Sequence, residues 1–248
     1  MTALVEEPRA VALPGGARAI DMIDMLLRDR AGMLARVRAG TDLHAVIRTM
    51  AATIAVALVV VGAALGSFRG GVQVGYAAVK MPLVLLGTAA LSAPALSAIG
   101  AALGRRSRLS SDLALVMTAL AFGALLVAAC TPLLLLGRAM HIGYHRTILV
   151  AVAMFALGGG AALRMVVGEL AAARAPGWRS AITGLTIVFT LVAGQLSWAL
   201  RPYLVRPQSV DVPFLRQVEG SFLDAVPEAI RSARGIYREP AGRWGSAP

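Results

Sequence analysis

Five apolar runs, nearly free of charge, constrain the fold of this chain more than any other feature. A membrane helix needs about 20 apolar residues, because the hydrocarbon layer is about 30 Å thick and an α-helix rises about 1.5 Å per residue. Backbone N–H and C=O groups in lipid must be satisfied within their own segment, so such runs form helices. The runs are Ala51–Leu65, Pro82–Leu103, Leu113–Leu136, Thr147–Val167 and Ile182–Leu200. We therefore predict an all-α integral membrane protein, a bundle of about five transmembrane helices.

The composition agrees with this prediction. Of the 248 residues, 58% are hydrophobic and 15% are charged, whereas soluble domains average about 25% charged residues. The formal net charge of +11 suits an anionic lipid surface, to which each nearby basic residue adds about 1 kcal/mol of attraction. Nucleic acid is the other common partner of a basic chain, but here the arginines are scattered over helix ends and tails. We expect lipid, and no nucleic acid, as the partner.

The chain divides into an N-terminal tail (1–42), a transmembrane domain (43–203) and a C-terminal tail (204–248). Each tail contains an amphipathic segment, Arg18–Arg38 and Pro213–Tyr237, so amphipathic interfacial helices are expected at both ends. In the first segment the apolar positions are Ile20, Ile23, Leu26, Leu27, Leu34 and Val37. This stripe predicts either a helix lying in the membrane interface or a helix packed on the protein's own surface, and the pattern favours neither.

The N-terminus does not have the pattern of a cleavable signal, because Glu6 and Glu7 stand where basic residues are expected. The first span is then expected to act as an uncleaved anchor, in a bacterial inner membrane. Five spans place the two tails on opposite sides. The arginines of the short loops favour an N-terminus inside by the positive-inside rule, whereas the basic C-terminal tail favours the reverse.

Small residues recur at the spacing that brings membrane helices together. GxxxG patterns let backbones approach closely, because packing rather than hydrophobicity drives helix association in lipid. The glycines in question are Gly62, Gly66, Gly100, Gly104, Gly158, Gly159 and Gly160. They predict either a self-association face, which would make a homo-oligomer, or close packing within the bundle. Packing within the bundle is favoured, since the pattern is common in a chain rich in Ala and Gly.

Two prolines inside the apolar runs predict helix kinks, Pro94 in the second span and Pro132 in the third. Pro82 is expected at the first helical position of the second span, where its missing donor costs nothing.

The fifth span carries aromatic residues at both ends, which is typical of an interfacial belt. Trp178 and Trp198 are the predicted anchors within the span, and Arg201 and Tyr203 would meet the headgroups just beyond it. A second interpretation makes this last stretch a docking point for the C-terminal segment, and the anchor interpretation is preferred.

Ionisable residues are scarce in the apolar regions. Lys80 and Arg164 fall near predicted span ends, where their side chains can reach the headgroups, and Glu169 is one candidate partner for Arg164. No Asp or Glu lies within the five apolar runs, which counts against a proton-coupled transporter. His141 and His145 are spaced as two metal ligands on one helix face, but no third ligand is adjacent, so no metal is expected.

The spans and their prolines resemble those of bacterial Yip1-like small polytopic membrane proteins of unknown function. The resemblance covers Leu43–Tyr203 and is carried by Lys80-Met81-Pro82 at the start of the second span, Pro94, Thr131-Pro132 and the string Trp198–Tyr203. It implies a role in membrane organisation and trafficking, and it supplies no catalytic residues.

The sequence therefore predicts a non-enzymatic membrane scaffold or anchor that positions a partner complex. Nucleotide-binding and hydrolase motifs are absent from the sequence, so no cofactor and no catalytic residue are expected. The alternative is a small transporter or permease subunit, in which proline-broken helices expose backbone at mid-membrane. A membrane enzyme ranks third, since no catalytic pair can be named.

Overall fold

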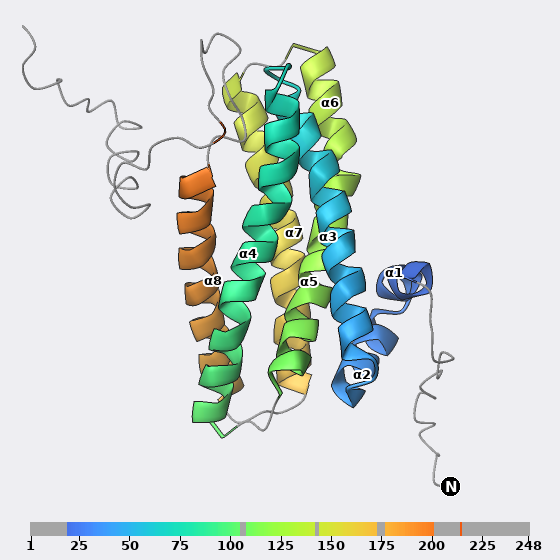
Figure 1. Cartoon of the computed structure of the whole chain (residues 1–248), viewed down its shortest axis with the longest axis vertical. Coiled ribbons are helices and arrows are strands. Elements are labelled where there is room, and N and C mark those ends of the chain that lie inside the picture. Colours follow the sequence, from blue (N-terminus) through green and yellow to red (C-terminus); the bar gives the residue numbers. More distant parts are fainter. Residues whose placement is uncertain (1–18, 105–107, 142–143, 173–176, 201–213, 215–248) are drawn as a thin grey trace, which may run out of the picture.

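The computed structural model describes residues 19–104, 108–141, 144–172, 177–200 and Phe214, and this part of the chain contains helices and turns but no strand. The helices are α1 (Ala19–Arg28), α2 (Arg30–Ala39), α3 (Leu43–Gly66), α4 (Gln73–Ala102), α5 (Leu109–Ala129), α6 (Thr131–Ala139), α7 (Tyr144–Ala172) and α8 (Trp178–Leu200). Helices α3, α4, α5, α7 and α8 run side by side along the long axis (Figure 1). Helices α1 and α2 lie beside α3 at one end of this bundle, and α8 ends at the other.

Five helical segments are long and apolar enough to cross a membrane, which confirms the prediction of a helical bundle with five candidate spans. They are Leu43–Gly66, Gln73–Ala102, Leu109–Ala139, Arg146–Ala172 and Trp178–Leu200. The third consists of α5 and α6, which separate at Cys130. Pro132 lies in the first turn of α6, where the absence of its N–H leaves no hydrogen bond unmade.

Helix α4 begins nine residues before Pro82, so the prediction that Pro82 opens the second span is wrong. Both Pro82 and Pro94 lie inside one continuous helix. The early start has a packing reason. Gly62 and Gly66 of α3 leave room for the backbone of the first turns of α4, which pack directly against them.

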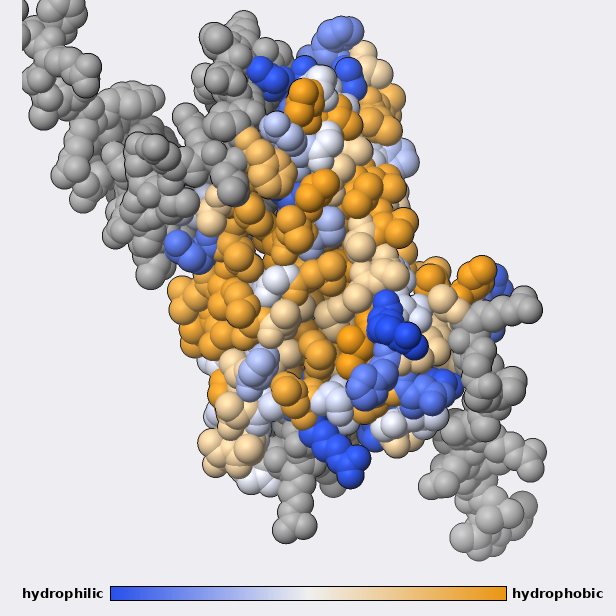
Figure 2. All heavy atoms as spheres, in the orientation of Figure 1, coloured by the Kyte–Doolittle hydropathy of each residue, from blue (hydrophilic) through white to orange (hydrophobic). Residues whose placement is uncertain are grey.

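The bundle has an inner and an outer part. Helix α3 packs against α4 and α5, α5 packs against α7, and α8 packs mainly against α4. Few residues of α7 and α8 are buried. The exposed side chains of α7 are largely apolar, whereas those of α8 include both polar and apolar residues. In Figure 2 hydrophobic residues cover the middle of the bundle, whereas hydrophilic residues gather toward its two ends. An apolar middle between polar ends is the distribution expected of a helical bundle that crosses a membrane.

The sequence predicts one helix over Arg18–Arg38, and the structure corrects this to two. The chain breaks at Asp29, whose backbone is not helical and whose carboxylate accepts a hydrogen bond from the N–H of Gly32 at 2.9 Å. Asp29 thus caps α2, because a short acidic side chain at this position satisfies an N–H that the helix leaves unbonded. The C-terminal amphipathic segment, Pro213–Tyr237, lies outside the described residues except for Phe214.

Candidate functional site

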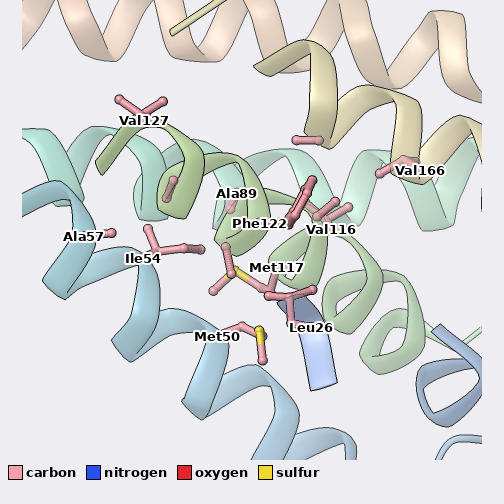
Figure 3. Close-up of a cluster of buried hydrophobic side chains, with 14 of the residues drawn as sticks. Leu26, Met50, Ile54, Ala57, Ala89, Val116, Met117, Phe122, Val127 and Val166 are labelled. Atoms are coloured by element: carbon pink, nitrogen blue, oxygen red, sulfur yellow. The ribbon is translucent and has the colours of Figure 1, made fainter. Parts of the chain in front are cut away.

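Helices α1 and α2, which we call the N-terminal platform (Ala19–Ala39), dock on the side of the bundle. Leu26 is fully buried and lies beside Met50 of α3 and Met117 of α5 (Figure 3). The other buried apolar side chains of the platform are Met22, Met33 and Val37. Burying a side chain of this size contributes about 1.5–3 kcal/mol. Of the two sequence interpretations, the structure therefore supports packing on the protein's own surface for this face.

A bidentate ion pair ties the platform to the far side of the bundle. Arg38 of α2 donates from Nε to Oε1 of Glu169 at 2.7 Å and from Nη2 to Oε2 at 2.8 Å. The hydrogen bond and the charge of Glu169 raise the pKa of Arg38. Glu169 lies near the end of α7, and its side chain is only 11% exposed. The prediction that Glu169 could pair with Arg164 is wrong, because Glu169 pairs with Arg38 and Arg164 is exposed.

Two further polar contacts hold the platform. Arg36 donates to Asp42 at 2.7 Å across the turn that leads into α3. That turn reverses the chain through Gly40, whose φ of 73° is a left-handed conformation that glycine adopts without strain. The guanidinium of Arg30 lies 4.8 Å from the ring centroid of Phe122 on α5, a cation–π contact.

The outer face of α1 is not covered by any described part of the chain. Ile20 is 74% exposed and Leu27 is 49% exposed, although both are large apolar residues. Asp24 and Arg28 pair with each other at 2.6 Å on the same short helix, with both side chains largely exposed. The platform thus uses one apolar face for docking and presents a second, smaller one outward.

The structure places a second polar site on α4, toward the opposite end of the bundle. Lys80 is fully buried, so the prediction that it reaches the headgroups from a span end is wrong. Its Nζ lies 4.9 Å from the ring centroid of Phe214, and the Tyr76 ring meets the same ring edge-on at 5.1 Å. Within the described part of the chain Nζ makes no hydrogen bond. One feature of the sequence could have indicated that Lys80 is buried. Lys80 lies about one helical turn after Ala77, and the backbone of Ala77 packs against Gly62.

The predicted packing glycines fall into distinct groups. A Cβ on Gly62 would collide with the carbonyl of Ala77, and one on Gly66 would lie 2.5 Å from the carbonyl O of Gln73. A Cβ on Gly158 would lie 2.7 Å from the carbonyl O of Gly123 on α5.

These three glycines therefore mediate packing within the bundle, between α3 and α4 and between α5 and α7. By contrast, a Cβ added to Gly159 or Gly160 would have no neighbour within 4 Å, and both residues lie on the exposed side of α7. Gly100 is buried in α4, whereas Gly104 lies in the turn after that helix with a φ of 82°.

The predicted interfacial anchors are only partly within the described residues. Trp178 opens α8, with the guanidinium of Arg179 at 5.4 Å from its ring centroid, and Trp198 lies in the last turn. Arg201 and Tyr203 lie outside the described residues. The positions of the two tryptophans, at the ends of one candidate span, are those that the belt prediction requires.

One buried carboxylate was missed by sequence reasoning. Asp112, one residue before the third apolar run, is 2% exposed and accepts a hydrogen bond of 2.7 Å from Ser97 Oγ on α4. His141 lies in the turn after α6, and the side chain of His145 is outside what the structure describes. The described residues contain no group of three side chains that could ligate a metal ion.

Comparison with family models, with curated proteins and with solved structures finds no match to this chain.

Proposed function

We propose that this chain is a non-enzymatic scaffold or anchor of a bacterial inner membrane. Its five long helices cross the bilayer, and the bundle holds the N-terminal platform in a fixed position where it meets a partner complex. The observation that carries the proposal is the docked platform with an uncovered apolar outer face, formed by Ile20 and Leu27.

A scaffold needs a rigid presenting surface, and the platform has the contacts for one. Its inner face is buried against α3 and α5, and Arg38 binds α7. Since the platform is fixed to three spans, a partner bound to its outer face is held at a defined place relative to the membrane. Basic side chains of the platform favour anionic lipid beneath that partner. The resemblance to Yip1-like proteins, which implies membrane organisation, points in the same direction.

A photo-crosslinking amino acid at two neighbouring positions tests this function in native membranes. At Leu27, which faces outward, the crosslinker is expected to capture one discrete protein partner or a second copy of the chain. At Leu26, which faces α3 and α5, it is expected to give only crosslinks within the chain. Lipid adducts alone at Leu27, with no protein adduct, would overturn the scaffold proposal.

A small transporter or permease subunit is the second candidate, and one observation favours it. Lys80 is buried inside a candidate span, together with Pro82 and Pro94 in the same helix. Proline removes helical hydrogen bonds, and freed carbonyls and buried charges line many transport sites. Uptake of a radiolabelled anion into proteoliposomes, abolished in Lys80→Met, would support this candidate over the scaffold.

A further inference from the structure

The described part of the chain supplies no counter-charge for Lys80. The carboxylates in that part are Asp21, Asp24, Asp29, Asp42, Asp112 and Glu169. All of them belong to the N-terminal platform, the turn after it, the start of α5 or the end of α7, and these elements meet at the end of the bundle away from Lys80 (Figure 1). A buried ammonium without a counter-charge is strongly unfavourable, and the cation–π contact with Phe214 compensates only part of that cost.

The residues beside Lys80 on α4 are hydrogen-bond donors of the kind that oxyanions require. Gln73, Tyr76 and Lys80 follow one another at spacings of three and four, so they share one face of the helix. Tyr76 supplies a phenol O–H and Lys80 an ammonium, whereas Gln73 has an interaction of its own. This face extends from the first turn of α4 toward the middle of the helix. The first turn is also the positive end of the helix dipole. Phe214 contacts both Tyr76 and Lys80 and shields the ammonium from water on one side.

We propose that the Tyr76–Lys80 face of α4 is a binding site for a phosphate-type oxyanion, with Lys80 Nζ as its counter-charge and Phe214 at its side. A phosphate group accepts several hydrogen bonds at once, which matches the ammonium of Lys80 and the hydroxyl of Tyr76 on one helix face. The group belongs either to free phosphate or to the headgroup of an anionic lipid. This inference does not depend on the scaffold proposal, because it concerns the other end of the bundle.

The sequence offers a direct probe, since Lys80 is the only lysine in the chain. The full-length protein in phosphatidylcholine nanodiscs is treated with an amine-selective reagent, and modification of Lys80 is followed by peptide mass spectrometry. Inorganic phosphate at ten times its dissociation constant is expected to slow the modification roughly tenfold. Phe214→Ala is expected to speed the modification without phosphate, because it removes the ring that covers Nζ.

A second arm identifies the source of the phosphate group. If phosphatidylglycerol nanodiscs protect Lys80 and inorganic phosphate does not, the natural ligand is a lipid headgroup. If inorganic phosphate protects Lys80 in both lipids, the ligand is a free anion.

Thermal unfolding of variants gives an independent readout. Phosphate is expected to raise the unfolding temperature of the wild type and of Arg146→Met, which removes an exposed charge from the start of α7. It is expected to have no effect on Lys80→Met, which should fold because it replaces a buried charge by an apolar side chain of similar length.

Two results would overturn the oxyanion site. The first is unchanged Lys80 reactivity and unchanged unfolding temperature with phosphate and with both lipids. The second is an unfolding temperature of Lys80→Met that rises with phosphate as much as that of the wild type, which would place the anion at another site.

Discussion

Arg38 and Glu169, 131 positions apart in the sequence, meet through two parallel hydrogen bonds of 2.7 and 2.8 Å. The pair joins the helix before the first span to the end of the fourth. Both oxygens of the carboxylate are used, so the contact fixes the orientation of α2 as well as its distance from α7. The N-terminal platform is thereby held by its buried apolar face and by a directional polar contact.

Removing Arg38 is expected to leave the largely buried Glu169 carboxylate without its partner. Arg38→Ala should lower the free energy of unfolding by about 1–3 kcal/mol, the usual cost of an unpaired polar group. A double-mutant cycle with Glu169→Gln, measured by unfolding in mixed micelles, should give a coupling energy of about 1 kcal/mol. Arg28→Ala is the control, because its partner Asp24 is exposed on the same helix, and it should cost under about 0.5 kcal/mol. Equal effects of the two substitutions would contradict this account.

The raised pKa of Arg38 defines how this contribution depends on pH. A cationic group with a raised pKa stabilises the fold fully below its ordinary pKa and loses that effect only as the pH rises through the raised value. Since arginine titrates only in strongly alkaline solution, the stability difference between wild type and Arg38→Gln should stay constant from neutral pH to about pH 10. Unfolding curves across this range provide the measurement, and a difference that shrinks within it would show that another group controls the contact.

Leu26 and Leu27 are neighbours in sequence with opposite environments, and they form a matched pair for testing the docking of α1. Leu26→Ala should destabilise the protein by about 2–5 kcal/mol and make the platform sensitive to protease, because it empties a fully buried position. Leu27→Ala should change the stability by less than about 0.5 kcal/mol, since its side chain is half exposed. Similar protease sensitivity in both variants would indicate that α1 does not dock through Leu26.

Gly158 and Gly159 form a second matched pair, on α7. Gly158→Ala would push a methyl group against the backbone of Gly123, so α5 and α7 must separate, at a cost of about 1–3 kcal/mol. Gly159→Ala meets open space and should be neutral or stabilising by up to about 1 kcal/mol, because alanine is the better helix former. Thermal unfolding of both variants in the same detergent measures the difference in stability. A larger loss of stability in Gly159→Ala than in Gly158→Ala would contradict this account.

The helical spans could be predicted because lipid imposes a length and a composition on each of them. The docking of the platform could be predicted only as one of two alternatives, since an apolar stripe is equally suited to lipid and to protein. The residues that dock also differ in part from the predicted stripe: Met22 and Met33 are buried, whereas Ile20 is exposed. The break at Asp29 does not cause this difference, because at 3.6 residues per turn the four buried residues share one face of a continuous helical wheel. The predicted stripe left out the methionines and was therefore centred on a neighbouring face.

The polar sites were least predictable, because they depend on contacts between distant segments. A span that starts at Pro82 would leave Lys80 at its end, whereas the earlier start of α4 places Lys80 two turns inside the helix. Glu169 has an arginine five positions before it in the sequence but binds one that lies 131 positions away. Spacing along a helix reveals which residues share a face, and it does not reveal which other helix that face meets.

The Arg38–Glu169 pair also has a consequence for the time course of synthesis. At about 5–20 residues per second, a ribosome adds Glu169 roughly 7 to 26 seconds after Arg38. During that interval α2 has been made but its partner carboxylate does not yet exist. The final orientation of the platform is therefore reached only after the fourth span has been translated, so a truncated chain does not display it.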